Sequence, residues 1–331
     1  MKNVSASLVL ILLALAGLSA SAQTIRRVNN TGISGTNIYT QVDAAITASA
    51  AGDIIQIEPS GAAYSPFTVN KNVTIVGPGY FLDPSQNPNL QANPLSATIQ
   101  GGISVLSGGA GATVVGLELT DYFIITSANN FTVQRCKFNR VYINSGSSPI
   151  TNLNIKQCYF SSIQDFYGIS SDNMLIANNI ITGSFTLPAN YNGGFFNNVV
   201  LAGIGTTNFF VTNNYFGSAF PSPTGNTLAN NIGAATNFPT TNGNQANIAT
   251  SSVFTLAPGA TAFDAWYQLK AGPNPARTTG SGGTDVGAFS IYSTNAPYKL
   301  GGVPAIPAIY QQSQTITGNS LNGSLSTRAN N

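Results

Sequence analysis

Side chains that could carry out chemistry are few in this chain. It contains no His, ten Asp and Glu, and twelve Lys and Arg among 331 residues. Without His, proton transfer at neutral pH would depend on carboxylates, Lys or Arg. One basic cluster could bind the carboxylate of an acidic substrate, with a solvated surface as the alternative interpretation: Arg135, Lys137, Arg140 and Lys156.

The carboxylates in the same part of the chain do not form a catalytic set. They are Glu118, Asp121, Asp165 and Asp172, and they share no column of the repeat described below. Glu118 aligns with Lys137, which predicts a surface ion pair worth at most about 1 kcal/mol. The chain also lacks zinc-ligand spacing, a phosphate-binding loop and a G-x-S-x-G motif. We therefore expect no catalytic residue, no cofactor and no metal site.

A repeat between residues 130 and 233 organises the chain. Six segments share the template Asn, apolar, any, apolar, any, any, Cys or Asn, any, apolar, at steps of 16 to 22 residues. Short alternating apolar runs at such a period indicate the strands of a solenoid. The segments read NFTVQRCKF, NLNIKQCYF, NMLIANNII, NGGFFNNVV, NFFVTNNYF and the degraded GNTLANNIG.

Stacked coils would place equivalent template positions directly above one another, about 4.8 Å apart. The fourth position predicts one internal column, from Val133 and Ile155 to Leu228, and the ninth predicts a second, from Phe138 to Phe216. The seventh position lies where the coil turns. Asn there can bond to the next Asn, satisfy turn backbone groups and tolerate a left-handed conformation. The expected ladder is Cys136, Cys158, Asn179, Asn198, Asn214 and Asn231.

These residues resemble the asparagine ladder of right-handed parallel β-helix proteins of the pectate-lyase-like class. The stretch GTDVGAF from residue 283 is similar to the closing segment of secreted β-helix proteins of the Bacteroidetes type. The resemblance implies an all-β solenoid with a short helix capping its first coil. In this class, hydrolases need clustered aspartates and a His, and lyases need a calcium-binding acidic group with an Arg or Lys. The acidic residues of this chain do not match either set.

The chain divides into an export signal, one long domain and a tail. Residues 1–22 have a Lys start, an apolar run and the small-residue site Ala-Ser-Ala, which predicts a secretory signal peptide. Residues 23–290 form the β-helix domain, with an amphipathic capping helix at 40–51. Residues 79–94 form an outer loop that is one candidate for ligand binding. Residues 291–331 are a Pro-rich closing segment followed by a polar tail expected to be disordered.

Two Cys in an exported protein raise the question of a disulfide. Directly stacked positions of adjacent parallel strands have awkward geometry for such a bridge. We favour free apolar thiols at Cys136 and Cys158 and keep the disulfide as the alternative.

The eighth template position should face outward, yet it becomes apolar after its first member. A long apolar stripe in water invites association, so a cover is expected, either residues 254–310 of the chain itself or a partner such as a stacked glycan. The column is Lys137, Tyr159, Ile180, Val199, Tyr215 and Ile232. The residues expected to face a ligand are Tyr159, Tyr215, Arg135 and Lys137.

The expected function is that of an exported, non-catalytic protein of the cell surface or extracellular space that contacts glycans. The alternative is a polysaccharide lyase or glycoside hydrolase acting on a uronate-containing polymer. Charged residues are only 7% of the chain, against about 25% in average proteins, and the net charge is +2. Nucleic acid is therefore not an expected partner. We further expect a monomer without a transmembrane segment after signal cleavage.

Overall fold

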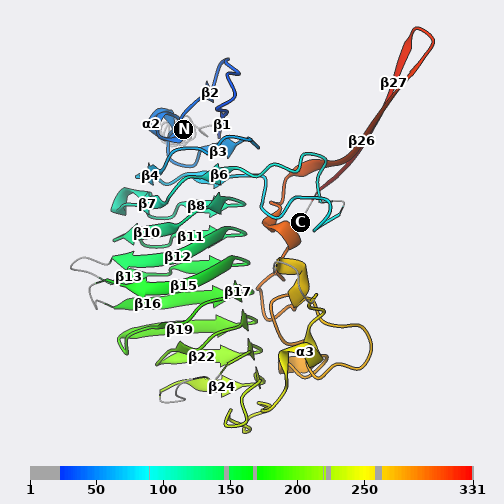
Figure 1. Cartoon of the computed structure of the whole chain (residues 1–331). Helices are drawn as coiled ribbons and strands as arrows, with labels where there is room; N and C mark the ends of the chain where they lie inside the picture. The colour runs from blue at the N-terminus through cyan, green and yellow to red at the C-terminus, as the bar shows by residue number, and fades with distance from the viewer. Residues whose placement is uncertain are drawn as a thin grey trace, which may run out of the picture.

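The computed structural model of this chain is a parallel β-solenoid of about eight turns (Figure 1). It describes residues 23–88, 90–144, 149–166, 170–218, 220, 225–257 and 263–329. The predicted signal peptide at 1–22 lies outside these residues. No helix in the described ranges is long and apolar enough to cross a membrane.

Two long sheets form the walls of the coil, and the strands of each are parallel (Figure 1). Sheet A contains β1 (Ile25–Val28), β2 (Ile38–Tyr39), β3 (Ile54–Ile57), β5 (Thr74–Val76), β8 (Thr113–Val115), β11 (Thr132–Gln134), β13 (Ile150–Thr151), β14 (Asn154–Lys156), β16 (Ser171–Ala177), β19 (Tyr191–Phe196), β22 (Phe209–Thr212) and β24 (Thr227–Ala229). Sheet B contains β4 (Phe67–Val69), β6 (Thr98–Ile99), β7 (Ile103–Val105), β9 (Glu118–Leu119), β10 (Tyr122–Thr126), β12 (Lys137–Asn144), β15 (Tyr159–Asp165), β17 (Ile180–Ile181), β20 (Val199–Val200), β23 (Tyr215–Phe216) and β25 (Ile232–Gly233). A third, short pair joins β18 (Phe185–Thr186) to β21 (Ile204–Gly205).

The register of the strands confirms the two predicted internal columns. In sheet A, Val133 pairs with Ile155 and Ile155 with Ile176, and the pairing continues to Leu228. In sheet B, Phe138 pairs with Phe160, and the pairing continues to Phe216. These side chains belong to one continuous buried core. Stacking of like residues on like residues therefore holds the solenoid together.

Each coil turns at two left-handed positions, and neither is the ladder position. The first and sixth template residues, such as Asn130 and Arg135, have φ between 51° and 62° where they are not Gly, except at Asn192. The prediction of a left-handed conformation at the seventh residue is therefore wrong. Asn occurs often at both left-handed positions because it pays little strain there. The seventh residue then follows the turn with ordinary backbone angles and lies inside the coil.

The seventh-position side chains form a hydrogen-bonded ladder in the interior. From Asn179 to Asn231, each side-chain amide donates to the side-chain oxygen of the Asn in the next coil at 2.9–3.0 Å. That oxygen also accepts the backbone N–H of the preceding rung. The ladder continues to Asn244, beyond the point where the sequence repeat ends. Because these groups are fully buried, the ladder satisfies polar atoms that would otherwise be unpaired.

The two cysteines occupy the first two rungs as free thiols. Both are fully buried, and the backbone N–H of Cys158 donates to the Asn179 side chain at 2.8 Å. Burial raises the pKa of Cys136 to about 12 and raises the pKa of Cys158 well above its usual value. The prediction of unbridged apolar thiols is confirmed.

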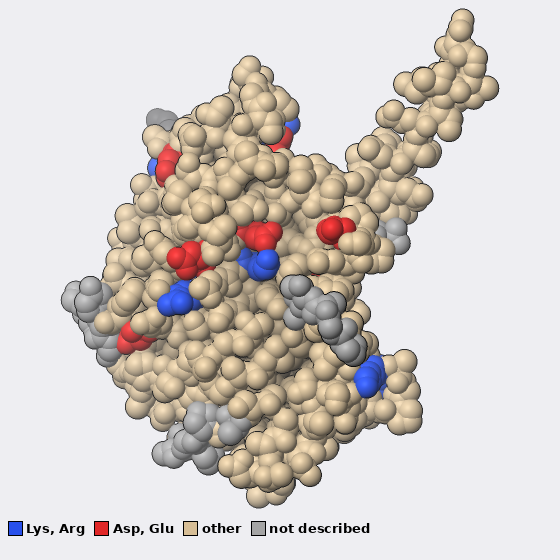
Figure 2. Space-filling view, viewed as in Figure 1, with Lys and Arg blue, Asp and Glu red and all other residues tan. Residues whose placement is uncertain are grey.

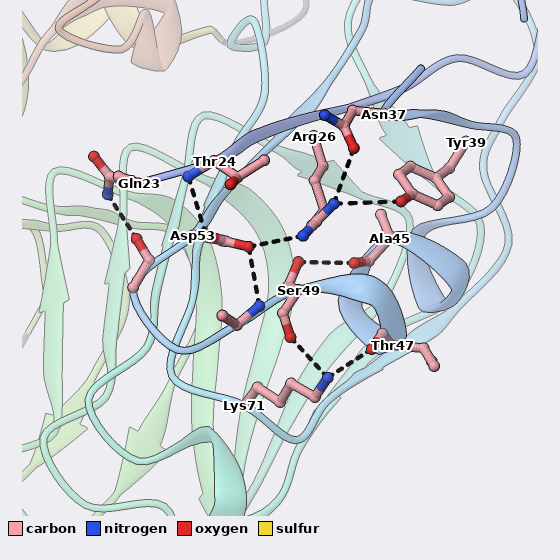
Figure 3. A network of polar contacts seen from close by, with 12 residues as sticks. Gln23, Thr24, Arg26, Asn37, Tyr39, Ala45, Thr47, Ser49, Asp53 and Lys71 are labelled. Atoms are coloured by element: carbon pink, nitrogen blue, oxygen red, sulfur yellow. Dashed lines mark hydrogen bonds and ion pairs between the residues drawn. The ribbon is translucent and has the colours of Figure 1, made fainter. Parts of the chain in front are cut away.

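A short helix closes the first coil, as predicted. It is α2 (Val42–Ala48), whose Val42, Ala45 and Ile46 are buried against the solenoid. Figure 3 shows the polar contacts behind it, which centre on Asp53. The Asp53 carboxylate accepts the N–H groups of Thr24 and Ala50 and pairs with Arg26 at 3.1 Å. Asp53 therefore fixes the turn between α2 and β3, in line with the predicted turn role.

Residues 250–257 and 263–303, which we call the clasp, run along the outside of sheet B (Figure 1). The clasp contains α3 (Thr250–Val253) and the short 3-10 turns η2 (Asp264–Tyr267), η3 (Ser281–Gly283) and η4 (Leu300–Gly302). Its buried side chains form a second core with the outward column of sheet B. Ile180 and Val199 have no exposed surface, and the Tyr215 ring meets the Phe254 ring edge-on at 4.9 Å. The predicted cover by the C-terminal part of the chain is confirmed.

The sixth template position holds the clasp in place. Its left-handed turns direct side chains outward from successive coils, where they bond to clasp residues in reverse chain order. The contacts are Arg135 with Val303, Gln157 with Ala296 and Pro297, Asn178 with Ala288 and Ser290, Asn213 with Ser281 and Thr284, and Asn230 with Thr279. Asn197 occupies the same column and is fully buried, but its amide has no hydrogen-bond partner among the described residues.

A buried polar cluster ties the outer loop at 79–94 to the clasp. The Asp264 carboxylate accepts hydrogen bonds from Asn87, Tyr298 and the Gly301 N–H, and the Tyr298 hydroxyl contacts that of Tyr80. Burial raises the pKa of Asp264, although these hydrogen bonds oppose the shift. The loop is thus packed into the structure through its residues Tyr80 and Asn87.

The tail forms an antiparallel hairpin instead of the expected disordered segment. Its strands are β26 (Pro307–Thr317) and β27 (Ser320–Ala329), and it projects away from the solenoid (Figure 1). Cross-strand pairing, with one register shift between Ile309 and Gln311, and a Ser313–Ser324 hydroxyl contact at 2.6 Å join the two strands.

Candidate functional site

The structure separates the four residues that were expected to face a ligand. Tyr215 is fully buried and Arg135 is 5% exposed, because both lie beneath the clasp. Tyr215 donates to the Ile248 carbonyl at 3.0 Å, and Arg135 donates to Val303. These two residues are occupied by contacts within the chain, so they cannot take part in a ligand face. Only Tyr159 and Lys137 remain partly accessible.

Tyr159 and Lys137 line a shallow depression of about 450 Å³ on sheet B, which we call the Lys137 groove. Lys137 pairs with Glu118 at 2.6 Å, as the sequence alignment predicted, and lies over the Phe81 ring at 4.6 Å. Glu118 also accepts a hydrogen bond from Ser96. The Lys137 groove therefore brings together a carboxylate and an amine, but each is engaged by other groups of the protein.

Burial, followed by the nearby Tyr267 and Asp264, raises the pKa of the Tyr159 phenol well above its usual value. Its ring packs edge-on against Phe81 from the outer loop at 5.3 Å. A neutral, half-buried phenol of this kind can donate a hydrogen bond or stack, but it cannot act as a base near neutral pH. Phe81 of the outer loop thus packs against both Tyr159 and Lys137, two of the residues that line the Lys137 groove.

Figure 2 shows how sparsely charge is distributed over the face in view, most of which is uncharged. Among the described residues, no three His, Cys, Asp or Glu side chains approach closely enough to hold a metal ion. The few charged residues are spread over the molecule, some of them in pairs such as Arg277 with Asp285 at 3.5 Å. The described residues therefore give little support for a catalytic or metal site that needs several charged side chains close together.

A second depression, on the outer face of sheet A, has a different character. It has a volume of about 500 Å³ and is formed by strands β14, β16, β19 and β22; we call it the sheet A hollow. None of its ten lining residues is charged. They are Asn154, Asn173, Met174, Leu175, Asn192, Gly193, Gly194, Phe196, Asn208 and Phe210. Aromatic rings beside amides in a shallow, uncharged depression suit a ligand that is both apolar and rich in hydroxyl groups.

Two glycines shape the sheet A hollow. A Cβ at Gly194 would come within 2.1 Å of the Phe196 ring, which shows that this ring lies over the Gly194 backbone. A Cβ at Gly193 would meet the Met174 carbonyl at 1.9 Å. The pair therefore allows β19 to approach β16 closely and provides the space that the Phe196 ring occupies. The neighbouring Phe210 is 62% exposed.

Amides line one side of the sheet A hollow as a second, exposed ladder. The Asn152 amide donates to Asn130, and the Asn173 amide donates to Asn152, both at 2.7 Å. Asn192 accepts the Asn173 N–H and donates to the Asp172 carboxylate at 2.9 Å. The first template position thus supplies a column of polar groups beside the aromatic rings, with one carboxylate at its edge.

The sheet A hollow is not among the sites predicted from the sequence. A signal was present, because the third and fifth template positions face outward and change from polar residues in the first two segments to several apolar residues in the third to fifth segments. Thr132 and Asn154 give way to Leu175 and Phe210, and Gln134 gives way to Phe196. The Gly-Gly pair inside a strand also indicates close backbone approach.

Comparisons with known proteins give no independent assignment. No protein-family model, no curated protein and no solved structure matches this chain.

Proposed function

We propose that this chain is an exported, non-catalytic protein of the cell surface or extracellular space that contacts glycans through the sheet A hollow. The observation that carries the proposal is the exposure of Phe210, at 62%, beside a depression lined by amides and without charge. Sugars present apolar ring faces that stack on aromatic rings and hydroxyl groups that bond to amides. A surface so poor in charge offers little to a nucleic acid.

We also propose that the coil is right-handed and that the chain is related to the pectate-lyase-like class, in the form found in secreted Bacteroidetes proteins. The support is the internal asparagine ladder, the short capping helix and the closing GTDVGAF segment. Export rests on the signal-like sequence of residues 1–22.

The test is a glycan-array screen of the purified chain from residue 23, run in parallel with incubation of the same protein with polysaccharides. The proposal expects binding to at least one glycan class and no release of shorter products. The matched variant is Phe210→Ala, which should lose most of the signal. Release of unsaturated or reducing-end products by the wild type would overturn the non-catalytic assignment.

A second candidate is a lyase or hydrolase acting on a uronate polymer at the Lys137 groove. It is favoured by one observation, the approach of the Glu118 carboxylate and the Lys137 amine within a depression of about 450 Å³. In its neutral form the amine could remove a proton, and in its protonated form the carboxyl group could donate one. This candidate expects product release that disappears in Lys137→Met and persists in Phe210→Ala, which separates it from the first.

A further inference from the structure

We propose that the ligand of the sheet A hollow is a neutral glycan chain that lies along the solenoid axis and contacts successive coils, and that it is not a uronate polymer. This inference rests on the proposed glycan function and adds to it the ligand's charge and its direction.

The direction follows from the register of the strands. Leu175, Gly194 and Phe210 are aligned in three successive coils, and the Phe196 ring occupies the outer surface above Gly194. An apolar surface therefore recurs once per coil, at the spacing of parallel strands, about 4.8 Å. A ligand that uses all three surfaces must cross the strands, which means that it follows the solenoid axis.

The amides repeat in the same direction. Asn173, Asn192 and Asn208 occupy the first template position of these three coils. Asn173 and Asn208 use their amide nitrogens within the protein, donating to Asn152 and to the Ala189 carbonyl. Both residues are exposed and line the sheet A hollow, and an amide oxygen can accept hydrogen bonds from ligand hydroxyl groups. Each coil thus offers one apolar surface, and the outer two of the three also offer such an acceptor, a pattern that matches a chain of sugar rings.

The charge follows from the side chains around the sheet A hollow. Its lining contains no Lys or Arg that could pair with a uronate carboxylate. The charged group at its edge is the Asp172 carboxylate, which accepts a hydrogen bond from Asn192 and would repel an anionic ligand. The nearest basic residue in the strand register is Lys156, which lies on the same face of β14 as the lining residue Asn154 but two coils from Phe196. A neutral glycan fits this arrangement better than an acidic one.

The experiment is a titration of the purified protein with neutral β-1,4-linked xylose and glucose oligosaccharides of increasing length, and with oligogalacturonate of the same lengths. We expect the affinity for a neutral series to rise with length until the ligand spans the three coils. Oligogalacturonate should bind about tenfold more weakly or worse.

Two variants locate the site. Phe210→Ala removes one apolar surface, and Gly194→Ser places an atom where the Phe196 ring lies and displaces that ring. Each should weaken neutral-glycan binding by about 3- to 10-fold. Phe166→Ala is the matched control, because Phe166 is 48% exposed and stacks on Tyr142 away from the sheet A hollow. Its affinity should equal that of the wild type.

The possible failures are distinguishable. If oligogalacturonate binds as tightly as the neutral chains, or if affinity does not rise with length, the inference is overturned while the glycan function stands. If neutral chains bind but neither variant weakens them, the inference is overturned and the sheet A hollow is not the site, although glycan binding itself stands. If no glycan of either kind binds, the proposed function itself fails, and the inference falls with it.

Discussion

The two outer faces of the solenoid differ in the fate of their apolar side chains. On sheet B, the clasp covers Ile180, Val199 and Tyr215 completely, whereas on sheet A Phe210 remains 62% exposed. Both faces are built from the same repeat, in which outward positions can be polar or apolar. The comparison teaches that an apolar outward column predicts a contact, and that the rest of the chain decides whether the contact is internal.

The largest expected effect comes from the same substitution made on each face. Phe254→Ala removes a fully buried clasp ring that packs on Tyr215, and it should lower the free energy of unfolding by about 3–5 kcal/mol. Phe210→Ala on sheet A should change it by no more than about 0.5 kcal/mol. Urea denaturation of both variants measures the difference. Similar losses in the two would remove the distinction between a structural face and an open one.

The next-largest loss of stability is expected from the asparagine ladder inside the solenoid. Asn198→Leu leaves the Asn179 amide and backbone N–H without their acceptor and should cost roughly 1–3 kcal/mol or more. The control is Asn154→Leu, because Asn154 faces outward on sheet A and the next coil carries Leu at the aligned position. Its cost should stay within about 0.5 kcal/mol. Equal costs in a denaturation series would contradict the role of the ladder.

Two residues at the sixth template position of successive coils, Asn178 and Asn197, test how that position holds the clasp. Asn178→Gly removes hydrogen bonds to the Ala288 and Ser290 carbonyls and should cost roughly 1–3 kcal/mol. Asn197→Gly should be nearly neutral, because the buried Asn197 amide has no partner among the described residues. Gly suits the left-handed backbone at both positions. Thermal unfolding of the two variants measures this difference. A larger loss of stability in Asn197→Gly than in Asn178→Gly would show that the Asn197 amide is hydrogen-bonded in solution.

The smallest effect is a pH dependence of opposite sign in the cap and in the clasp. Burial alone would raise the pKa of Asp53, but hydrogen bonds from Ala50 and Thr24 and the Arg26 charge lower it below 3.8. Its contribution to stability is therefore present above that value and is lost as the pH falls. The pKa of Asp264 is raised by burial, so its contribution is complete at low pH and is lost as the pH rises above 3.8.

Unfolding midpoints measured from about pH 3 to about pH 8 test both signs against Asn variants. Relative to Asp53→Asn, the wild type should lose stability at the acidic end. Relative to Asp264→Asn, it should lose stability toward the neutral end. Parallel pH profiles for the two variants would contradict the assigned environments.

The parts that the sequence predicted are those that depend on neighbouring coils. The columns through Val133 and Phe138, the ladder from Asn179 and the Glu118–Lys137 pair all follow from one alignment, because equivalent residues stack on each other. The cover of the sheet B stripe was also predicted, from the need to bury it.

The parts that the sequence missed depend on contacts without periodicity. Asn178 bonds to a residue 110 positions later, and no repeat indicates such a partner. Tyr215 was expected on a ligand face for this reason, although the clasp buries it. The Asn244 rung follows Asn231 after only 13 residues, outside the spacing of the other rungs. The sheet A hollow depends on the Phe196 ring lying over Gly194, a conformation that the pattern of polar and apolar residues does not specify.

A crystal structure of the protein with a bound neutral oligosaccharide tests the central claim most directly, namely that the open face of sheet A binds ligand and the clasped face is structural. The account predicts a sugar chain along the solenoid axis over Leu175, Phe196 and Phe210, with the clasp unchanged. A sugar bound in the Lys137 groove, or at a sheet B column uncovered by displacement of the clasp, would contradict it.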